Sequence, residues 1–198
     1  MSDLYNFDLK IKNDKIKYLC GIDEVGRGPL AGPVYAVAFI FPGFEIDGVN
    51  DSKKLSQKKR ESIFDLMRSK DVKYGLGCSS VEEIDKFNIL NSTYLAMKRA
   101  VKNLDVTPDL ILVDGKFVPD FGIETRNIIR GDSISYSIAS ASIIAKVLRD
   151  RLMIKIHDKF PDYGFNNNKG YGTKYHIEAL KKIGPCEIHR KSFLKKIL

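Results

Sequence analysis

The sequence predicts an α/β fold in which helices flank a mixed central sheet. Short apolar runs bounded by glycine and proline, which are typical of strands, occur early in the chain and recur later. Segments with apolar residues at helical spacing separate the later runs. The strands come in succession at first and then alternate with helices, a pattern that favours antiparallel and parallel pairing within one sheet.

The early part of the chain contains three expected strands, at residues 18–23, 34–41 and 72–78. The loop at residues 26–33 joins the first two and holds three glycines and two prolines, which predicts a tight connection with an unusual backbone conformation. A helix is expected at residues 56–69, because Ser56 can cap its first turn and its apolar residues share one face.

The later part of the chain alternates helices with strands. Ser80 and Glu83 have the spacing of a capping box, which predicts a short helix, and a longer helix with apolar spacing follows before Pro108. The remaining elements are expected strands at residues 110–113 and 127–129 and expected helices at residues 137–159 and 173–183.

Length and charge indicate the class of protein. The chain has 198 residues, about the length of one domain, and 43% of them are hydrophobic, which excludes a disordered chain. We expect one domain over residues 1–198, with a basic helical region at about residues 151–198. The formal net charge is +8, and residues 151–198 hold eleven basic and four acidic side chains. This excess favours a polyanionic partner, most often nucleic acid.

The three cysteines, Cys20, Cys78 and Cys186, are far apart in the sequence and form no C-x-x-C pair. Such a set excludes a disulfide framework and a structural zinc site, so we expect buried, reduced thiols. Residues 1–17 lack the apolar segment of a signal peptide, and no apolar stretch is long enough to span a bilayer. We therefore expect a soluble cytoplasmic monomer that does not bind membranes.

Acidic residues end three of the expected strands. Asp23 and Glu24 follow the first strand, Asp114 follows the fourth and Asp132 closes the fifth. Functional sites of α/β sheets collect beyond strand ends, and converging carboxylates repel one another unless a cation lies between them. These residues therefore predict a site for Mg²⁺ or Mn²⁺, which prefer oxygen ligands. The alternative for each acid alone is a turn or a helix cap.

The adjacency of Asp23 and Glu24 presents a difficulty, because neighbouring residues of a regular strand face opposite sides of the sheet. Both side chains can join one metal cluster only if the strand twists or bulges there, which the nearby Gly26 would allow. Otherwise Glu24 contributes through its backbone carbonyl.

Further polar residues are candidates for contacts with nucleic acid. The loop Gly26-Arg27-Gly28 combines accessible backbone amides with a guanidinium that fits phosphate. Lys53 lies in a polar segment before a helix, and Tyr171 lies between two glycines, where its ring can stack on a sugar or base. The alternatives are a plain turn, a solvated loop and an ordinary loop tyrosine.

Seven segments together resemble bacterial ribonuclease HII. They are GIDEVGRGPLAGPV (residues 21–34), DSKKL (51–55), DG (114–115), GD (131–132), SASIIAKVLRDR (140–151), GYGTKYH (170–176) and HRKSF (189–193). The resemblance spans nearly the whole chain in family order. It implies the ribonuclease H-like fold and one catalytic domain.

The resemblance also implies an activity. This activity is endonucleolytic hydrolysis of the RNA strand of RNA/DNA hybrids, including cleavage 5′ of single ribonucleotides embedded in duplex DNA, and it leaves 3′-hydroxyl and 5′-phosphate ends. Two divalent ions would assist the hydrolysis. The ligands implied by the resemblance are Asp23, Glu24, Asp114 and Asp132, with Asp23 bridging the two ions.

Substrate recognition is implied in the same way. The backbone of residues 26–28 and Tyr171 would sense the 2′-hydroxyl, and Lys53, Lys146 and the C-terminal lysines would hold phosphates. Residues 195–198 could tether a partner that takes part in replication or in ribonucleotide excision repair.

Two departures and several alternatives accompany the resemblance. Val25 stands where a small residue is expected and Lys116 where asparagine is common, which should alter packing or rate only.

The alternatives are other classes of protein. The related ribonuclease HIII carries threonine where this chain has Arg27, so ribonuclease HII is the better match. A DNA-directed nuclease or junction resolvase with this fold would cut substrates without ribose, and a non-catalytic RNA-binding module would show no turnover. The three histidines, His157, His176 and His189, are expected to have structural or surface roles.

Overall fold

A computed structural model describes residues 1–116, 118–195 and 197–198 of the chain. Within these residues, a five-stranded sheet has the order β3-β2-β1-β4-β5. The strands are β1 (Leu19–Val25), β2 (Val34–Ile40), β3 (Tyr74–Ser79), β4 (Leu110–Asp114) and β5 (Thr125–Ile128). The first three strands pair antiparallel, whereas β1, β4 and β5 run parallel. The expected mixed sheet is confirmed.

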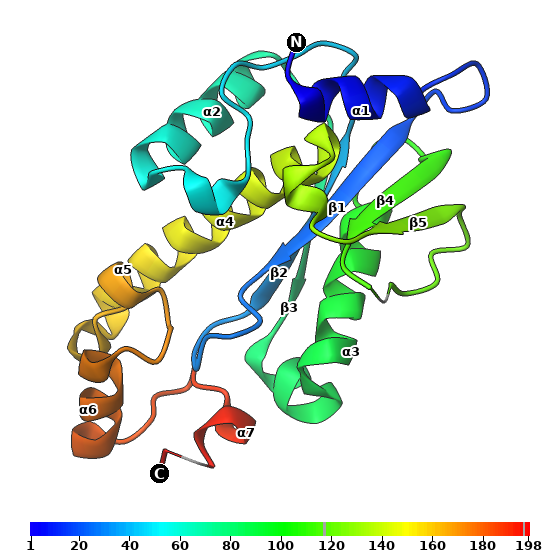
Figure 1. Ribbon diagram of the computed structural model, residues 1–198. Coiled ribbons are helices and arrows are strands. Elements are labelled where there is room, and N and C mark those ends of the chain that lie inside the picture. The colour runs from blue at the N-terminus through cyan, green and yellow to red at the C-terminus, as the bar shows by residue number, and fades with distance from the viewer. Residues whose placement is uncertain (117, 196) are drawn as a thin grey trace.

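Helices cover both faces of the sheet (Figure 1). On one face, α3 (Val81–Lys102) packs on β2 and β3. On the other face, the long helix α4 (Tyr136–Lys159) crosses β1 and β2, and α1 (Asp3–Ile11) and α2 (Gln57–Ser69) pack against α4. The molecule is therefore a helix–sheet–helix sandwich, as the alternation of elements predicts.

The C-terminal elements gather at the far end of α4 (Figure 1). They are α5 (Phe165–Asn168), α6 (Lys174–Ile183) and α7 (Lys191–Leu194), with a short 3₁₀ turn at Pro161–Tyr163. Elsewhere in the described residues, short 3₁₀ turns lie at Ser52–Lys54 and Gly131–Ser133. The C-terminal helices share a small apolar cluster with Leu30 and Ala31 of the loop at residues 26–33. The basic C-terminal region is thereby packed against that loop.

Strand β1 is buried on both faces, and its residues alternate between two apolar cores. Leu19 belongs to the core under α4, and Cys20 and Ile22 belong to the core under α3. A side chain at Gly21 would overlap the backbone of Ser137, so glycine allows α4 to approach the strand closely. This contact brings the first half of α4 close to the end of β1.

Helix α1 was not predicted, because it is short and its apolar and polar residues are interspersed, which gives little local signal. Tertiary contacts hold it in place. Leu4 and Tyr5 are buried, and the carboxylate of Asp8 accepts a hydrogen bond from the backbone N–H of Ser137 at 2.7 Å. Asp8 thus satisfies a free donor in the first turn of α4, a role that only the folded chain defines.

Most element boundaries agree with the sequence to within one or two residues. The short and long helices after residue 80 are joined as α3, with a break at Asn88, whose φ is 68°. The prediction that Asp132 closes the fifth strand is wrong, because β5 ends at Ile128 and Asp132 lies in the following 3₁₀ turn. The expectation of buried thiols is confirmed only for Cys20. Cys78, in the edge strand β3, and Cys186, which follows α6, are both partly exposed.

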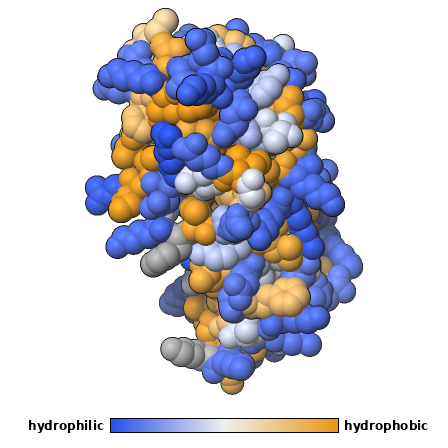
Figure 2. Space-filling model, turned by 90° about the vertical axis from the view of Figure 1, so that its right-hand side faces the viewer, coloured by the Kyte–Doolittle hydropathy of each residue, from blue (hydrophilic) through white to orange (hydrophobic). Residues whose placement is uncertain are grey.

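In the described part of the chain, no helix has the length and apolar character needed to cross a membrane. The face toward β5 and α3 carries hydrophilic side chains over much of its surface, with apolar atoms showing between them (Figure 2).

Candidate active site

Two of the predicted acids lie next to each other at the ends of parallel strands. Ile22 of β1 pairs with Val113 of β4, so the following residues, Asp23 and Asp114, are neighbours at the same edge of the sheet. The 3₁₀ turn after β5 adds Asp132, because the N–H of its neighbour Gly131 donates a hydrogen bond to Asp114 Oδ1 at 2.6 Å. The parallel topology thus collects acids that are remote in the sequence.

A cavity of about 310 Å³ opens over this edge. It is lined by Asp23, Glu24 and Asp114 and by all six residues predicted to contact nucleic acid, namely Gly26, Arg27, Gly28, Lys53, Lys146 and Tyr171. Asp132 joins the group through Lys53, whose Nζ lies 2.9 Å from Asp132 Oδ2. Ten predicted site residues, contributed by six separate stretches of the chain, therefore lie in or directly beside one cavity.

Glu24 reaches the cavity without the bulge that the sequence seemed to require. The register between β1 and β2 is uninterrupted through the pair Val25 and Tyr35. Strand β4 ends at Asp114, level with Asp23, so no β4 residue lies beside Glu24. The end of the neighbouring strand, rather than a bulge, leaves the Glu24 carboxylate open to the cavity.

Burial and neighbouring negative charges raise the pKa values of three carboxylates of the cavity. Burial raises the pKa of Asp23 well above its ordinary value, and the charges of Glu24 and Asp114 raise it further. Burial also raises the pKa of Glu24 and of Asp114. The Arg27 guanidinium, 3.1 Å from Glu24 Oε1, partly opposes the effect on Glu24.

Among the described residues, no three His, Cys, Asp or Glu side chains are close enough together to hold a metal ion. Instead, Glu24 turns to Arg27, Asp114 accepts the N–H of Gly131, and Asp132 pairs with Lys53. Every donor in this set is a hard oxygen, and the pKa values of three of the carboxylates are raised, first by burial and then by the negative charges of their neighbours. The donor set therefore fits a divalent cation such as Mg²⁺ or Mn²⁺.

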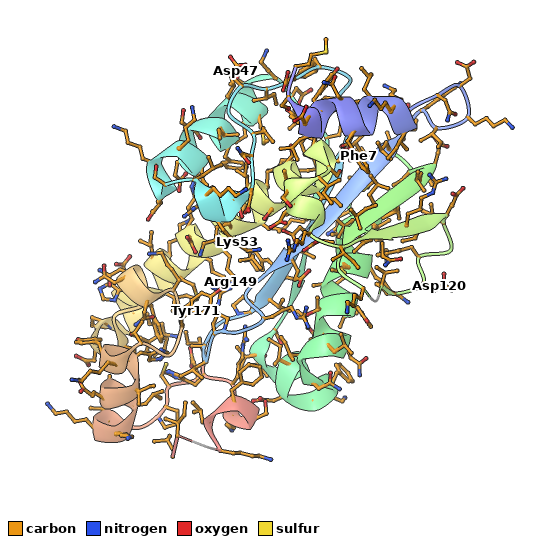
Figure 3. All side chains as sticks on the ribbon, viewed as in Figure 1. Phe7, Asp47, Lys53, Asp120, Arg149 and Tyr171 are labelled. Atoms are coloured by element: carbon orange, nitrogen blue, oxygen red, sulfur yellow. The ribbon has the colours of Figure 1, made fainter. Side chains whose placement is uncertain are left out.

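Tyr171 also lines the cavity. Its ring is 40% exposed, and Lys146 Nζ lies 5.9 Å from the ring centroid. A Cβ built on Gly28 would lie 3.6 Å from the ring, so Tyr171 and the glycine loop are in contact distance. Figure 3 shows Lys53, Arg149 and Tyr171 in a row between α4 and the part of the sheet where β1 ends and β2 begins.

Comparison with known proteins decides the family. The family model of ribonuclease HII matches residues 20–196 of this chain. The chain belongs to the ribonuclease HII family.

Individual relatives agree with this assignment. The ribonuclease HII of Caldicellulosiruptor bescii is 51% identical over 195 residues, which cover 98% of this chain and 95% of the relative. The ribonuclease HII of Clostridioides difficile is 53% identical over 182 residues, 91% of this chain and 71% of the relative. As a ribonuclease HII, the protein is a ribonuclease H that hydrolyses RNA in RNA/DNA hybrids and depends on divalent metal ions.

Solved structures confirm the ribonuclease H-like fold. The ribonuclease H2 of Pyrococcus horikoshii superposes with a TM-score of 0.73 at 26% identity, covering 91% of this chain and 96% of the other. The structure of a complex of PCNA with RNase HII from Archaeoglobus fulgidus also gives a TM-score of 0.73, at 25% identity, with coverage of 90% and 96%.

Several residues of this ribonuclease HII site were not anticipated individually. Ser52 and Ser142 line the cavity and hydrogen-bond to each other at 2.8 Å, and Arg60 Nη1 donates to the carbonyl of Ser52 at 2.9 Å. These contacts fix the segment that carries Lys53. Both serines lie in segments that resemble the family, but a hydroxyl in a loop or a helix gives no sequence signal of its partner.

No histidine of the described residues lines the cavity, and His176 and His189 have the expected structural role. His176 Nε2 lies 2.9 Å from His189 Nε2, and both side chains are buried. His176 Nδ1 lies 2.9 Å from the carbonyl oxygen of Tyr171, and the backbone N–H of Cys186 donates to His189 Nδ1 at 3.0 Å. This chain of hydrogen bonds supports the backbone beneath Tyr171.

Proposed function

We propose that this ribonuclease HII cleaves the RNA strand on the 5′ side of a ribonucleotide, including a single ribonucleotide in duplex DNA, and leaves 3′-hydroxyl and 5′-phosphate ends. The main support is the composition of one cavity, in which carboxylates lie beside a glycine loop and an exposed tyrosine ring. Carboxylates suit metal-assisted hydrolysis of a phosphodiester, whereas the loop and the ring suit recognition of ribose.

We assign the metal-binding role to Asp23, Glu24, Asp114 and Asp132. Two divalent ions, Mg²⁺ or Mn²⁺, bound there would activate the attacking water and stabilise the charge on the leaving oxygen. In the structure, Arg27 and Lys53 form ion pairs with Glu24 and Asp132 at 3.1 and 2.9 Å. These cations balance part of the charge and keep the two carboxylates near the cavity.

We assign recognition of the ribonucleotide to residues 26–28 and Tyr171, which lie within contact distance of each other at the cavity. Tyr171 would pack on the sugar at the RNA–DNA junction, and the loop would contact the 2′-hydroxyl, which DNA lacks. Lys53 and Lys146 would hold phosphates, since a lysine ammonium acts as a point charge that does not depend on base sequence.

Matched duplexes test this function. One carries a single ribonucleotide, one is entirely DNA, and one is a long RNA/DNA hybrid, each incubated with Mg²⁺, with Mn²⁺ or with EDTA. We expect metal-dependent cleavage 5′ of the ribonucleotide and no cleavage of the DNA duplex. Cleavage of the DNA duplex would favour a DNA-directed nuclease, and binding without turnover would favour an RNA-binding module.

We also propose a replication clamp as a partner of the C-terminal end. The support is the Archaeoglobus fulgidus relative, which was solved in a complex with PCNA. The predicted tether is residues 195–198, of which Lys196 lies outside the described residues. Removal of residues 195–198 should abolish co-elution with a sliding clamp while cleavage of a free duplex is retained, and unchanged co-elution would contradict the proposal.

A further inference from the structure

Two arginines hold the loop at residues 26–33 from the protein interior. Arg149 lies in α4 and Arg190 lies just before α7, and both side chains are fully buried. Within the described residues, neither guanidinium has a carboxylate partner. Their hydrogen bonds go to backbone carbonyls instead, so the charges are stabilised by peptide dipoles. Burying a charge without a carboxylate partner costs free energy. The hydrogen bonds that these two guanidinium groups make fix the backbone of the loop.

Arg190 holds the part of the loop that lines the active-site cavity. Its Nη2 donates to the carbonyl oxygen of Gly26 at 2.6 Å, and its Nη1 donates to the carbonyl oxygen of Arg27 at 3.0 Å. Its Nε donates to the carbonyl oxygen of Gly32 at 2.9 Å, which ties together the two ends of the loop. Because the guanidinium is planar and rigid, these contacts fix the orientation of consecutive peptide groups.

The fixed carbonyls determine where the following amides point. In a trans peptide group the C=O and the next N–H point in opposite directions, and the described peptide bonds are all trans. With the carbonyls of Gly26 and Arg27 bound to Arg190, the N–H groups of Arg27 and Gly28 point away from the interior. Neither N–H has an acceptor in the described part of the chain, and both residues line the cavity.

Arg149 provides an internal comparison, because it is equally buried but holds other peptide groups. It donates to the carbonyl oxygens of Ala31, Pro33 and Lys169 at 3.0 to 3.1 Å. It therefore joins the far end of the loop to the segment before Tyr171. The Arg149 side chain packs against Gly26, but it makes no hydrogen bond to the carbonyl of Gly26 or Arg27, so it does not hold the peptide groups that carry the N–H of Arg27 and Gly28.

We propose that Arg190 is a positioning residue for ribose recognition, which holds the N–H groups of Arg27 and Gly28 ready to donate to the 2′-hydroxyl oxygen of a ribonucleotide. This inference rests on the proposed function, in which the loop reads the ribose. Pre-oriented donors lose little freedom when the substrate binds, so discrimination against DNA depends on the buried guanidinium. Lysine at this position would keep the charge but not the planar set of donors.

The test measures preference in binding, without turnover. Fluorescence anisotropy in EDTA gives the affinity for a duplex with one ribonucleotide relative to an all-DNA duplex of the same sequence. We expect Arg190→Lys to lose about tenfold of this preference, the effect of about one hydrogen bond. Arg149→Lys should keep it within about twofold, although both variants lose stability. An Arg190→Lys protein with the wild-type preference, or an equal loss in both variants, would overturn the inference.

A failure of the proposed function gives a different result. If the wild-type protein itself shows no preference for the ribonucleotide, then the loop does not read ribose and the proposed function fails. If the wild-type preference is present and Arg190→Lys keeps it, only the role of Arg190 is wrong.

A second variant covers the case in which Arg190→Lys does not fold. Gly28→Pro removes the N–H of residue 28 and leaves Arg190 in place, and Gly28 has no positive φ that would exclude proline. Gly28→Ala keeps this N–H, and its Cβ would be in ordinary contact with the Tyr171 ring at 3.6 Å. We expect the proline variant to lose clearly more of the binding preference than the alanine variant. Equal preferences in the two variants would contradict the role of this amide.

Discussion

Asp23 and Asp114 lie side by side at the ends of β1 and β4, because the parallel register pairs Ile22 with Val113. Both carboxylates border the same cavity, and the charge of Asp114 contributes to the raised pKa of Asp23. The register therefore places two like charges together at a partly buried edge. Such an arrangement is unfavourable for folding but suitable for binding a divalent cation.

The first prediction concerns catalysis. Asp23→Asn or Asp114→Asn should lower the cleavage rate by at least about 10³-fold, because a bound metal ion contributes several kcal/mol of charge stabilisation. Binding to the hybrid in EDTA should stay within a few-fold of wild type. Single-turnover cleavage assays and anisotropy measure the two effects. Robust cleavage by either variant would remove that carboxylate from the metal site.

The second prediction concerns stability without metal. Asp23 is 6% exposed beside like charges, so Asp23→Asn should raise the free energy of unfolding by about 1 kcal/mol and Tm by a few degrees. Thermal unfolding in EDTA measures this change. Asp47→Asn is the control, since Asp47 is exposed and remote from the cavity (Figure 3), and it should leave Tm nearly unchanged. A lower Tm for Asp23→Asn would show that the carboxylate is stabilised in the fold.

The third prediction concerns the tyrosine. Tyr171→Ala should reduce kcat/KM for a duplex with a single ribonucleotide about tenfold more than for a long RNA/DNA hybrid, because stacking contributes about 1 to 3 kcal/mol. Tyr171→Phe, which keeps the ring, should behave much like wild type. Steady-state kinetics on the two substrates give the ratio. Equal losses on both substrates would exclude a role of Tyr171 at the junction.

The fourth prediction concerns phosphates. Raising salt from about 50 to 200 mM should weaken binding by orders of magnitude if several phosphates are contacted. Lys146 lies at the cavity, and Lys146→Gln should reduce the slope of log K against log salt by about 0.9. Lys15→Gln, a change at an exposed turn, is the control. An unchanged slope in Lys146→Gln would show that Lys146 does not contact a phosphate.

The fifth prediction concerns pH. Burial, together with the neighbouring His176, lowers the pKa of His189 to about 4, whereas an unfolded histidine has a pKa of about 6.5. The unfolded chain therefore binds more protons between these values, and stability should fall as the pH decreases from about 6.5 toward 4. The contribution is about 3 kcal/mol for this 2% exposed ring. Urea unfolding at several pH values measures the decline, which should be shallower in His189→Gln. Parallel declines in the two proteins would contradict it.

The sequence by itself determined the elements whose signals are local. The capping box at Ser80 and Glu83 forms as predicted, with hydrogen bonds of 2.9 and 3.3 Å that both residues supply within one turn. The apolar runs at β1, β2 and β4 form strands that are buried between the helices on the two faces of the sheet. The family resemblance also named most of the residues that line the cavity, because a sequence motif identifies residues even where their geometry is unknown.

Tertiary structure alone decided the features that depend on partners remote in the chain. Helix α1 is held by burial of Leu4 and Tyr5 and by the bond between Asp8 and Ser137, more than a hundred residues away. The open position of Glu24 depends on where a neighbouring strand ends, and the role of Arg190 depends on carbonyls of a loop near the other end of the chain. Local sequence encodes propensity, whereas these roles arise from long-range contacts that exist only after the chain has folded.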